Sequence, residues 1–122
     1  MANECIEKMV RAEGMILGSP VYFADVTAEM KALMDRAGFV SLANGGLYRN
    51  KVGAAVAAVR RSGAVHTLDG MNHFFLAAQM IIVGRSLAIG REKGEVKTDE
   101  EGMQAVKALG QRMAWLLGKL YR

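Results

Sequence analysis

The chain has 122 residues, which is enough for one compact domain with a single core. Its formal charge is +4 and 52% of its residues are hydrophobic, a composition that excludes a disordered, highly charged tail. The basic residues are scattered and are not interleaved with aromatic residues, so we expect no nucleic acid as a partner. No apolar run approaches the ~18 residues needed to span a bilayer, and we expect no membrane contact.

Cys5 is the single cysteine of the sequence. An internal disulfide and a cysteine-only metal site within these residues are therefore excluded, and we expect a free thiol and no bound metal. A chain without disulfides is typical of a reducing compartment, so the expected location is the cytoplasm.

The first half of the chain alternates helical and strand patterns. Apolar residues at helical spacing predict a helix over residues 3–13, with Asn3 as its N-cap. Residues 15–18 form a short apolar run, typical of a strand buried on both faces. A second helix is predicted to begin at Asp25 or Thr27 and to end at Gly38, and residues 43–46 are predicted to be a loop.

The second half continues the alternation. Residues 52–59 are an uninterrupted run of small apolar side chains, which predicts a central strand. A helix over residues 67–79 and a strand over residues 80–83 follow, and Thr98 and Glu101 form a capping box for the last helix. This order predicts an α/β fold with a parallel sheet, right-handed crossovers and helices on both faces.

Ligands of such sheets bind beyond the carboxyl ends of the strands, so the loops that begin at Ser19, Arg60 and Gly84 are expected to meet at one edge. In the first loop, Ser19 and Pro20 favour a rigid extended turn, and Tyr22 or Phe23 would cover an apolar ring. The alternative is an ordinary turn whose two aromatic side chains pack into the core.

The second loop carries Arg60, Arg61 and the flexible Gly63 just before a helix N-terminus. Backbone amides there suit an anion, or a ring carbonyl that gains negative charge. The alternative is a solvated basic loop. His66 follows closely, but no residue is identified as catalytic.

Longer segments resemble the NADPH-dependent FMN reductase family, and within it the iron-sulfur flavoprotein-like branch. Residues 18–23, with the sequence GSPVYF, and residues 27–38 resemble the third strand, the flavin loop and the following helix of that family. Residues 51–56, 60–63 and 66–67 resemble its fourth strand and second flavin loop, while residues 72–75 and 99–103 resemble its later helices.

The resemblance implies a flavodoxin-like, three-layer α/β fold that binds FMN and passes electrons from NAD(P)H to an acceptor. It places the flavin ring between the two loops, where Arg60 or Arg61 would stabilise charge on the reduced ring by our hypothesis. The implied cofactor-binding residues are Ser19, Pro20, Val21, Tyr22, Phe23, Arg60, Arg61, Ser62, Gly63, Ala64 and His66.

The family's first two strands, its phosphate-binding turn and the cysteine cluster of the branch have no counterpart here, so residues 1–122 are expected to form a partial, N-terminally truncated domain. The strand over residues 15–18 would then be an open edge. We therefore expect a homo-oligomer, either a dimer or a tetramer, or a complementing N-terminal segment. Two alternatives remain open: a flavin-binding electron carrier without NAD(P)H turnover, and a cofactor-free structural or engineered fragment that self-associates.

Overall fold

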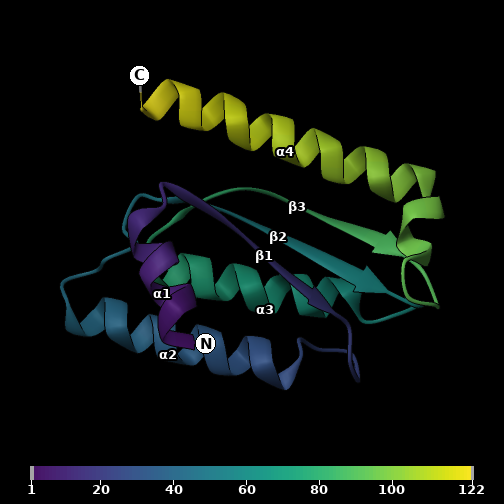
Figure 1. Cartoon of the computed structure of the whole chain (residues 1–122), viewed down its shortest axis with the longest axis horizontal. Coiled ribbons are helices and arrows are strands. Elements are labelled where there is room, and N and C mark those ends of the chain that lie inside the picture. The colour runs from purple at the N-terminus through teal and green to yellow at the C-terminus, as the bar shows by residue number, and fades with distance from the viewer. Residues whose placement is uncertain (1, 122) are drawn as a thin grey trace.

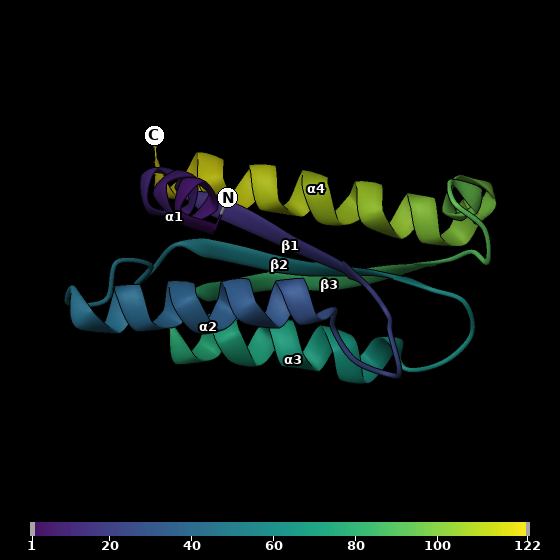
Figure 2. The ribbon, with the colours of Figure 1, turned by 60° about the horizontal axis from the view of Figure 1, so that its bottom comes forward.

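The computed structural model describes residues 2–121 and contains a parallel sheet in the order β1-β2-β3. Figures 1 and 2 show α2 and α3 on one face of this sheet and α4 on the other. The elements in chain order are α1 (Ala2–Arg11), β1 (Gly14–Pro20), α2 (Ala28–Ala43), β2 (Val52–Val59), α3 (Ala64–Ala77), β3 (Ile81–Ile89), the 3₁₀ turn η1 (Glu95–Thr98) and α4 (Glu100–Leu120).

The central strand β2 has the bounds that its small-residue run predicted. Ala54 and Ala55 are fully buried, and small side chains let the helices approach the strand closely. At Gly53 a Cβ atom would lie 2.8 Å from the ring of Phe75 on α3. The glycine is therefore required by the contact between helix and sheet.

Two cores lie on opposite faces of the sheet. The larger one joins α1, α2 and α3 to the sheet through residues such as Met9, Met34 and Leu68. The smaller one contains Leu109 and Met113 of α4. Three layers of helix, sheet and helix result, which confirms the predicted fold class.

Several predicted boundaries were wrong. The helix α1 already includes Asn3, so Asn3 is not its cap, and α2 continues through Gly38 to Ala43. Of the two predicted caps of α2, Thr27 is confirmed, because its Oγ1 accepts a hydrogen bond from the Met30 amide at 3.1 Å. The helix α3 begins at Ala64 rather than at Thr67.

The last strand and helix also differ from expectation. β3 does not stop at Val83, because an irregularity in its register near Gly84 lets residues 84–89 continue pairing with β2. Gly84 therefore lies inside the strand and opens no loop. Asp99, not Thr98, caps α4: its Oδ1 accepts from the Gly102 amide at 3.0 Å.

The strand β1 pairs only with β2 in the part of the chain that the structure describes. On the α4 side of the sheet, its residue Ile16 is 50% exposed, because α4 packs over β2 and β3. Within residues 2–121 both β1 and β3 are therefore edge strands, and part of one face of the sheet beside β1 stays uncovered.

Candidate functional site

The first loop leaves β1 and closes into a tight turn. The Val21 amide donates to the Ala58 carbonyl at 3.0 Å, which holds the start of the loop against β2. Tyr22 and Asp25 then exchange two backbone hydrogen bonds of 2.9 and 3.2 Å. Between them, Phe23 and Ala24 have φ values of +49° and +65°, the pattern of a type I′ turn. The left-handed backbone conformation is strained for residues other than glycine, so Phe23 and Ala24 store strain here. Such strain concentrates at functional sites.

The turn directs its aromatic side chains outward. Phe23 is fully exposed, and Tyr22 is also exposed. The alternative in which both rings pack into the core is therefore wrong. A large apolar ring held in water by a strained turn is suited to covering the flat surface of a ligand.

The second loop contacts this turn through Gly63, the residue before α3. Gly63 has a φ of +94° and ends the loop without a side-chain cap for the helix. A Cβ atom there would lie 2.7 Å from Ala24 Cα and 3.0 Å from Val21 Cγ1. Only glycine lets the two loops approach this closely.

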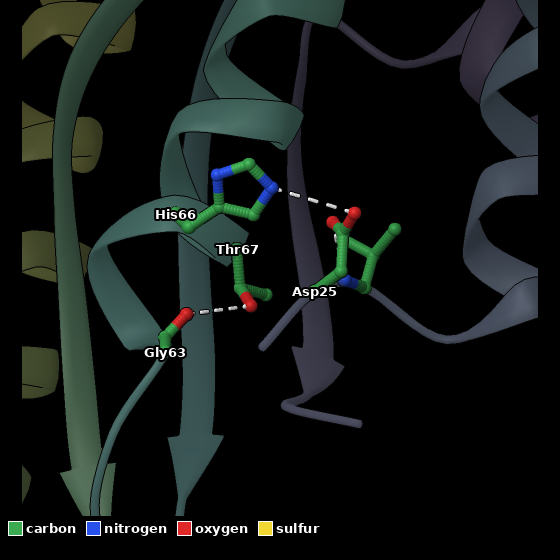
Figure 3. A network of polar contacts seen from close by, with 5 residues as sticks. Asp25, Gly63, His66 and Thr67 are labelled. Carbon is green, nitrogen blue, oxygen red and sulfur yellow. Dashed lines mark hydrogen bonds and ion pairs between the residues drawn. The ribbon is translucent and has the colours of Figure 1, made fainter. Parts of the chain in front are cut away.

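Polar side chains brace the same junction (Figure 3). His66 Nε2 lies 3.4 Å from Asp25 Oδ2, so the first turn of α3 is joined to the first loop. Buried Thr67 donates through its Oγ1 to the Gly63 carbonyl at 2.9 Å. Ser19 Oγ accepts from the Thr27 amide at 3.1 Å and donates to the Pro20 carbonyl at 2.8 Å. Of these contacts, His66–Asp25 joins the two loops, and the others order each loop internally.

A cavity of about 330 Å³ opens between the loops, and its wall residues are Val21, Phe23, Ala24, Arg60, Arg61 and Ser62. This volume is at the lower end of the range for small-molecule pockets. The first loop contributes Phe23 to this lining, and the second contributes Arg60 and Arg61. The cavity can therefore receive a planar group with a polar or anionic edge.

The structure brings together part of the predicted site. Val21, Phe23, Arg60, Arg61 and Ser62 line the cavity, and Gly63 presses the loops together beside it. The side chain of Ser19 is buried in the brace, and Ala64 is buried in the first turn of α3. Pro20, Tyr22 and His66 are also outside the cavity wall, although Tyr22 and His66 belong to the same two loops.

Sequence reasoning missed two contributors. Ala24 lines the cavity and meets Gly63, but its left-handed conformation leaves no trace in the residue type. Asp25 was considered only as a helix cap, whereas it closes the turn and pairs with His66. The one feature of the sequence that could have indicated this role was the position of Asp25 in a loop beside the predicted site.

Residues 2–121 contain no cluster of three or more His, Cys, Asp or Glu side chains arranged to hold a metal ion. Cys5 is exposed and unbonded. None of the helices described is long and apolar enough to cross a membrane.

Comparison with known proteins decides the family. The model of the NADPH-dependent FMN reductase family matches residues 1–94. The chain belongs to this family. The resemblance inferred from residues 18–38 and 51–67 is thereby confirmed, and the family match identifies FMN as the cofactor.

Iron-sulfur flavoproteins are among the curated relatives. One from Methanocaldococcus jannaschii is 40% identical over 122 residues, covering 92% of this chain and 62% of the relative. Another from Methanosarcina thermophila is 33% identical over 118 residues, covering 94% of this chain and 61% of the relative. The chain thus spans about three-fifths of the length of these relatives.

Solved structures share the fold at low identity. The Trp repressor binding protein from Bacillus subtilis superposes with a TM-score of 0.80 at 17% identity, covering 88% of this chain and 74% of that one. The general stress protein 14 from Treponema denticola, solved in complex with FMN, superposes with a TM-score of 0.68 at 10% identity, covering 92% of this chain and 73% of that one. The flavodoxin-like fold is confirmed.

The lining of the loop cavity includes Phe23, Arg60 and Arg61. An aromatic side chain and two cations suit a planar, electron-accepting ring. The cavity wall itself contains no glycine-rich turn of the kind that cradles a phosphate group. The site built by these loops is therefore a candidate for the flavin ring.

Proposed function

We propose that residues 1–122 form part of a flavodoxin-like domain that binds FMN between the two loops and acts as an NAD(P)H-dependent oxidoreductase. The observation that supports this most directly is the cavity at the ends of two adjacent strands, with Phe23 on one side and Arg60 and Arg61 on the other. Adjacent strand ends are where doubly wound sheets bind their ligands.

The protein's part in this function is positioning and electrostatics. Bound FMN would supply the redox chemistry, namely hydride acceptance from a nicotinamide and electron transfer to an acceptor. Of residues 20–23, Val21 and Phe23 line the cavity and would border the ring, with Phe23 shielding its apolar surface from water. The backbone amides of residues 62–64 would approach the polar edge of the ring, and Arg61 would stabilise negative charge there.

Association belongs to the same proposal. The open edge of β1 and the half-exposed Ile16 support either a complementing N-terminal segment or a second copy of the chain. The unbonded Cys5 agrees with the cytoplasm as the place of action.

Flavin binding is tested first by adding FMN and following the visible absorption bands through gel filtration. Flavin that stays with the protein supports the proposal, and a folded protein that retains none contradicts it. Oxidation of NADPH and of NADH by the loaded protein then separates an enzyme from an electron carrier.

Arg61→Ala tests the electrostatic role. Removing a positive charge beside the ring disfavours the reduced, more negative flavin, so the midpoint potential should fall by about 30 mV, a tenfold change for a two-electron couple. Arg112→Ala, on α4 and outside the cavity wall, removes the same charge as a control. Equal potentials in the Arg61 variant and the unmodified protein would refute the role.

A further inference from the structure

The turn that carries Phe23 has a sequence that does not favour its own backbone conformation. Phe23 and Ala24 occupy the two central positions of a type I′ turn, both with positive φ. Such turns strongly prefer asparagine, aspartate or glycine at these positions, and the left-handed conformation is disfavoured for other residues. Contacts from outside the turn must therefore help to hold it closed.

Two such contacts come from α3 and the loop before it. The first is the close approach of Gly63 to the Ala24 backbone. The second is made by the Asp25 carboxylate at the end of the turn (Figure 3). Its Oδ1 accepts from the Val26 amide at 2.7 Å, and its Oδ2 lies 3.4 Å from His66 Nε2. One carboxylate therefore joins the end of the turn to the first turn of α3.

The helix α3 leaves space for this carboxylate. Gly70 follows His66 by four residues, so the two residues are neighbours on one face of the helix. A Cβ atom at Gly70 would meet only Asp25 Oδ1, at 3.8 Å. The Asp25 side chain therefore lies over Gly70, within reach of the His66 imidazole.

The attraction within this pair depends on pH. Histidine ordinarily gains its positive charge as pH falls from 8 to 5, a range in which aspartate ordinarily stays charged. Within residues 2–121, Asp25 is the one ion-pair partner of His66. The other charged or titratable groups around His66 come from α3, from α2 and from the second loop: Asp69 and His73, Lys31 with its partner Asp35, and Arg60 and Arg61.

We propose that His66 and Asp25 form a pH-dependent contact that holds the turn closed, so that protonation of His66 favours the position of Phe23 beside the flavin ring. The flavin part of this inference rests on the proposed function. His66 is a positioning residue: it lies outside the cavity wall, and its influence on the ring passes through Asp25 and the turn. The two side chains are 70% and 55% exposed, and an exposed ion pair shifts an equilibrium by about 2- to 5-fold.

Hydrogen exchange on the flavin-free chain tests the contact directly. The Tyr22 amide closes the turn by donating to the Asp25 carbonyl at 2.9 Å, so its protection factor reports how often the turn opens. The protection factor of the unmodified protein, divided by that of His66→Gln, should be about 2–5 at pH 5.5 and about 1 at pH 8, because glutamine donates a hydrogen bond but gains no charge. Asp25→Asn keeps an acceptor for the Val26 amide and should remove the same pH dependence.

FMN titration then measures the consequence for the flavin. The dissociation constant of His66→Gln, divided by that of the unmodified protein, should rise from about 1 at pH 8 to about 2–5 at pH 5.5, because only the closed turn presents Phe23 to the ring. This ratio cancels the ionisation of the FMN phosphate, which changes in the same pH range. His73→Gln replaces the other histidine of the sequence and, as the matched control, should leave both ratios at about 1 at each pH. Sedimentation at the titration concentration checks that all variants share one association state.

Equal protection of the Tyr22 amide in the unmodified protein and in His66→Gln at pH 5.5 would overturn the inference. So would a ratio of dissociation constants that is the same at pH 5.5 and pH 8, or a His73→Gln variant that behaves like His66→Gln. An unmodified chain that retains no FMN contradicts the proposed function instead, and exchange on the flavin-free chain still decides whether His66 holds the turn.

Discussion

Gly63→Ala tests whether the contact between the two loops organises the site. The substitution adds a Cβ atom 2.7 Å from the Ala24 backbone, at a residue with a φ of +94°. The left-handed conformation should cost about 1–2 kcal/mol in the free energy of unfolding. The contact with backbone atoms, which cannot rotate away, should add about 1–3 kcal/mol, the usual cost of overpacking. We therefore expect a total loss of about 2–5 kcal/mol.

Gly94→Ala supplies a matched control. Gly94 precedes η1 with φ +84° and ψ −8°, close to the φ +94° and ψ −1° of Gly63. Nothing lies within 4 Å of a Cβ atom at Gly94. This variant should show the conformational cost alone, so the difference between the two variants isolates the contact with Ala24.

Urea denaturation measures both variants. If the slope with denaturant is unchanged, the two losses can be compared directly. FMN titration provides a second reading: Gly63→Ala should weaken flavin binding, because the loops separate, whereas Gly94→Ala should not. Equal destabilisation by the two substitutions would refute the close approach of the loops.

Two further substitutions test buried and capping groups. Tyr48 is fully buried, and its hydroxyl finds no hydrogen-bond partner among residues 2–121, so Tyr48→Phe should raise the free energy of unfolding by about 1 kcal/mol in urea denaturation. Burial raises the pKa of the Tyr48 phenol above 10.0, because the folded state favours its neutral form. The unmodified protein should therefore lose stability as pH rises above 10, and the Tyr48→Phe variant should lose less. The same loss of stability above pH 10 in both proteins would count against the role given to the Tyr48 hydroxyl. Hydrogen bonds from the Ile89 amide, at 2.8 Å, and then from the Gly102 amide hold the pKa of Asp99 below 3.8. The contribution of the Asp99 carboxylate to stability is therefore present above pH 3.8 and is lost as pH falls through the lowered pKa. Asp99→Asn should therefore flatten the acid side of the stability curve, and a thermal denaturation series from neutral pH downward that shows no flattening would contradict the assignment.

The positions of the elements followed from local patterns. The residues of β2 could be predicted because a run of small apolar side chains is compatible with few structures other than a buried central strand. Thr27 could be considered as a cap because its hydroxyl acts on an amide only three residues away. The pairing of Arg60 and Arg61 with the first loop followed from the parallel sheet, which places the carboxyl ends of neighbouring strands at one edge.

Contacts between residues distant in the sequence decided where some elements end and how the loops of the site are shaped. Gly38 does not end α2 and Gly84 does not end β3, because pairing and packing with other elements outweigh the local preference of one glycine. The outward Phe23 ring and the left-handed Ala24 depend on a turn that Gly63 supports from another loop. By itself the sequence determined the family, the order of the elements and the two loops of the site. Only the tertiary structure decided which side chains face the cavity, because that depends on residues some 40 positions apart meeting across adjacent strand ends.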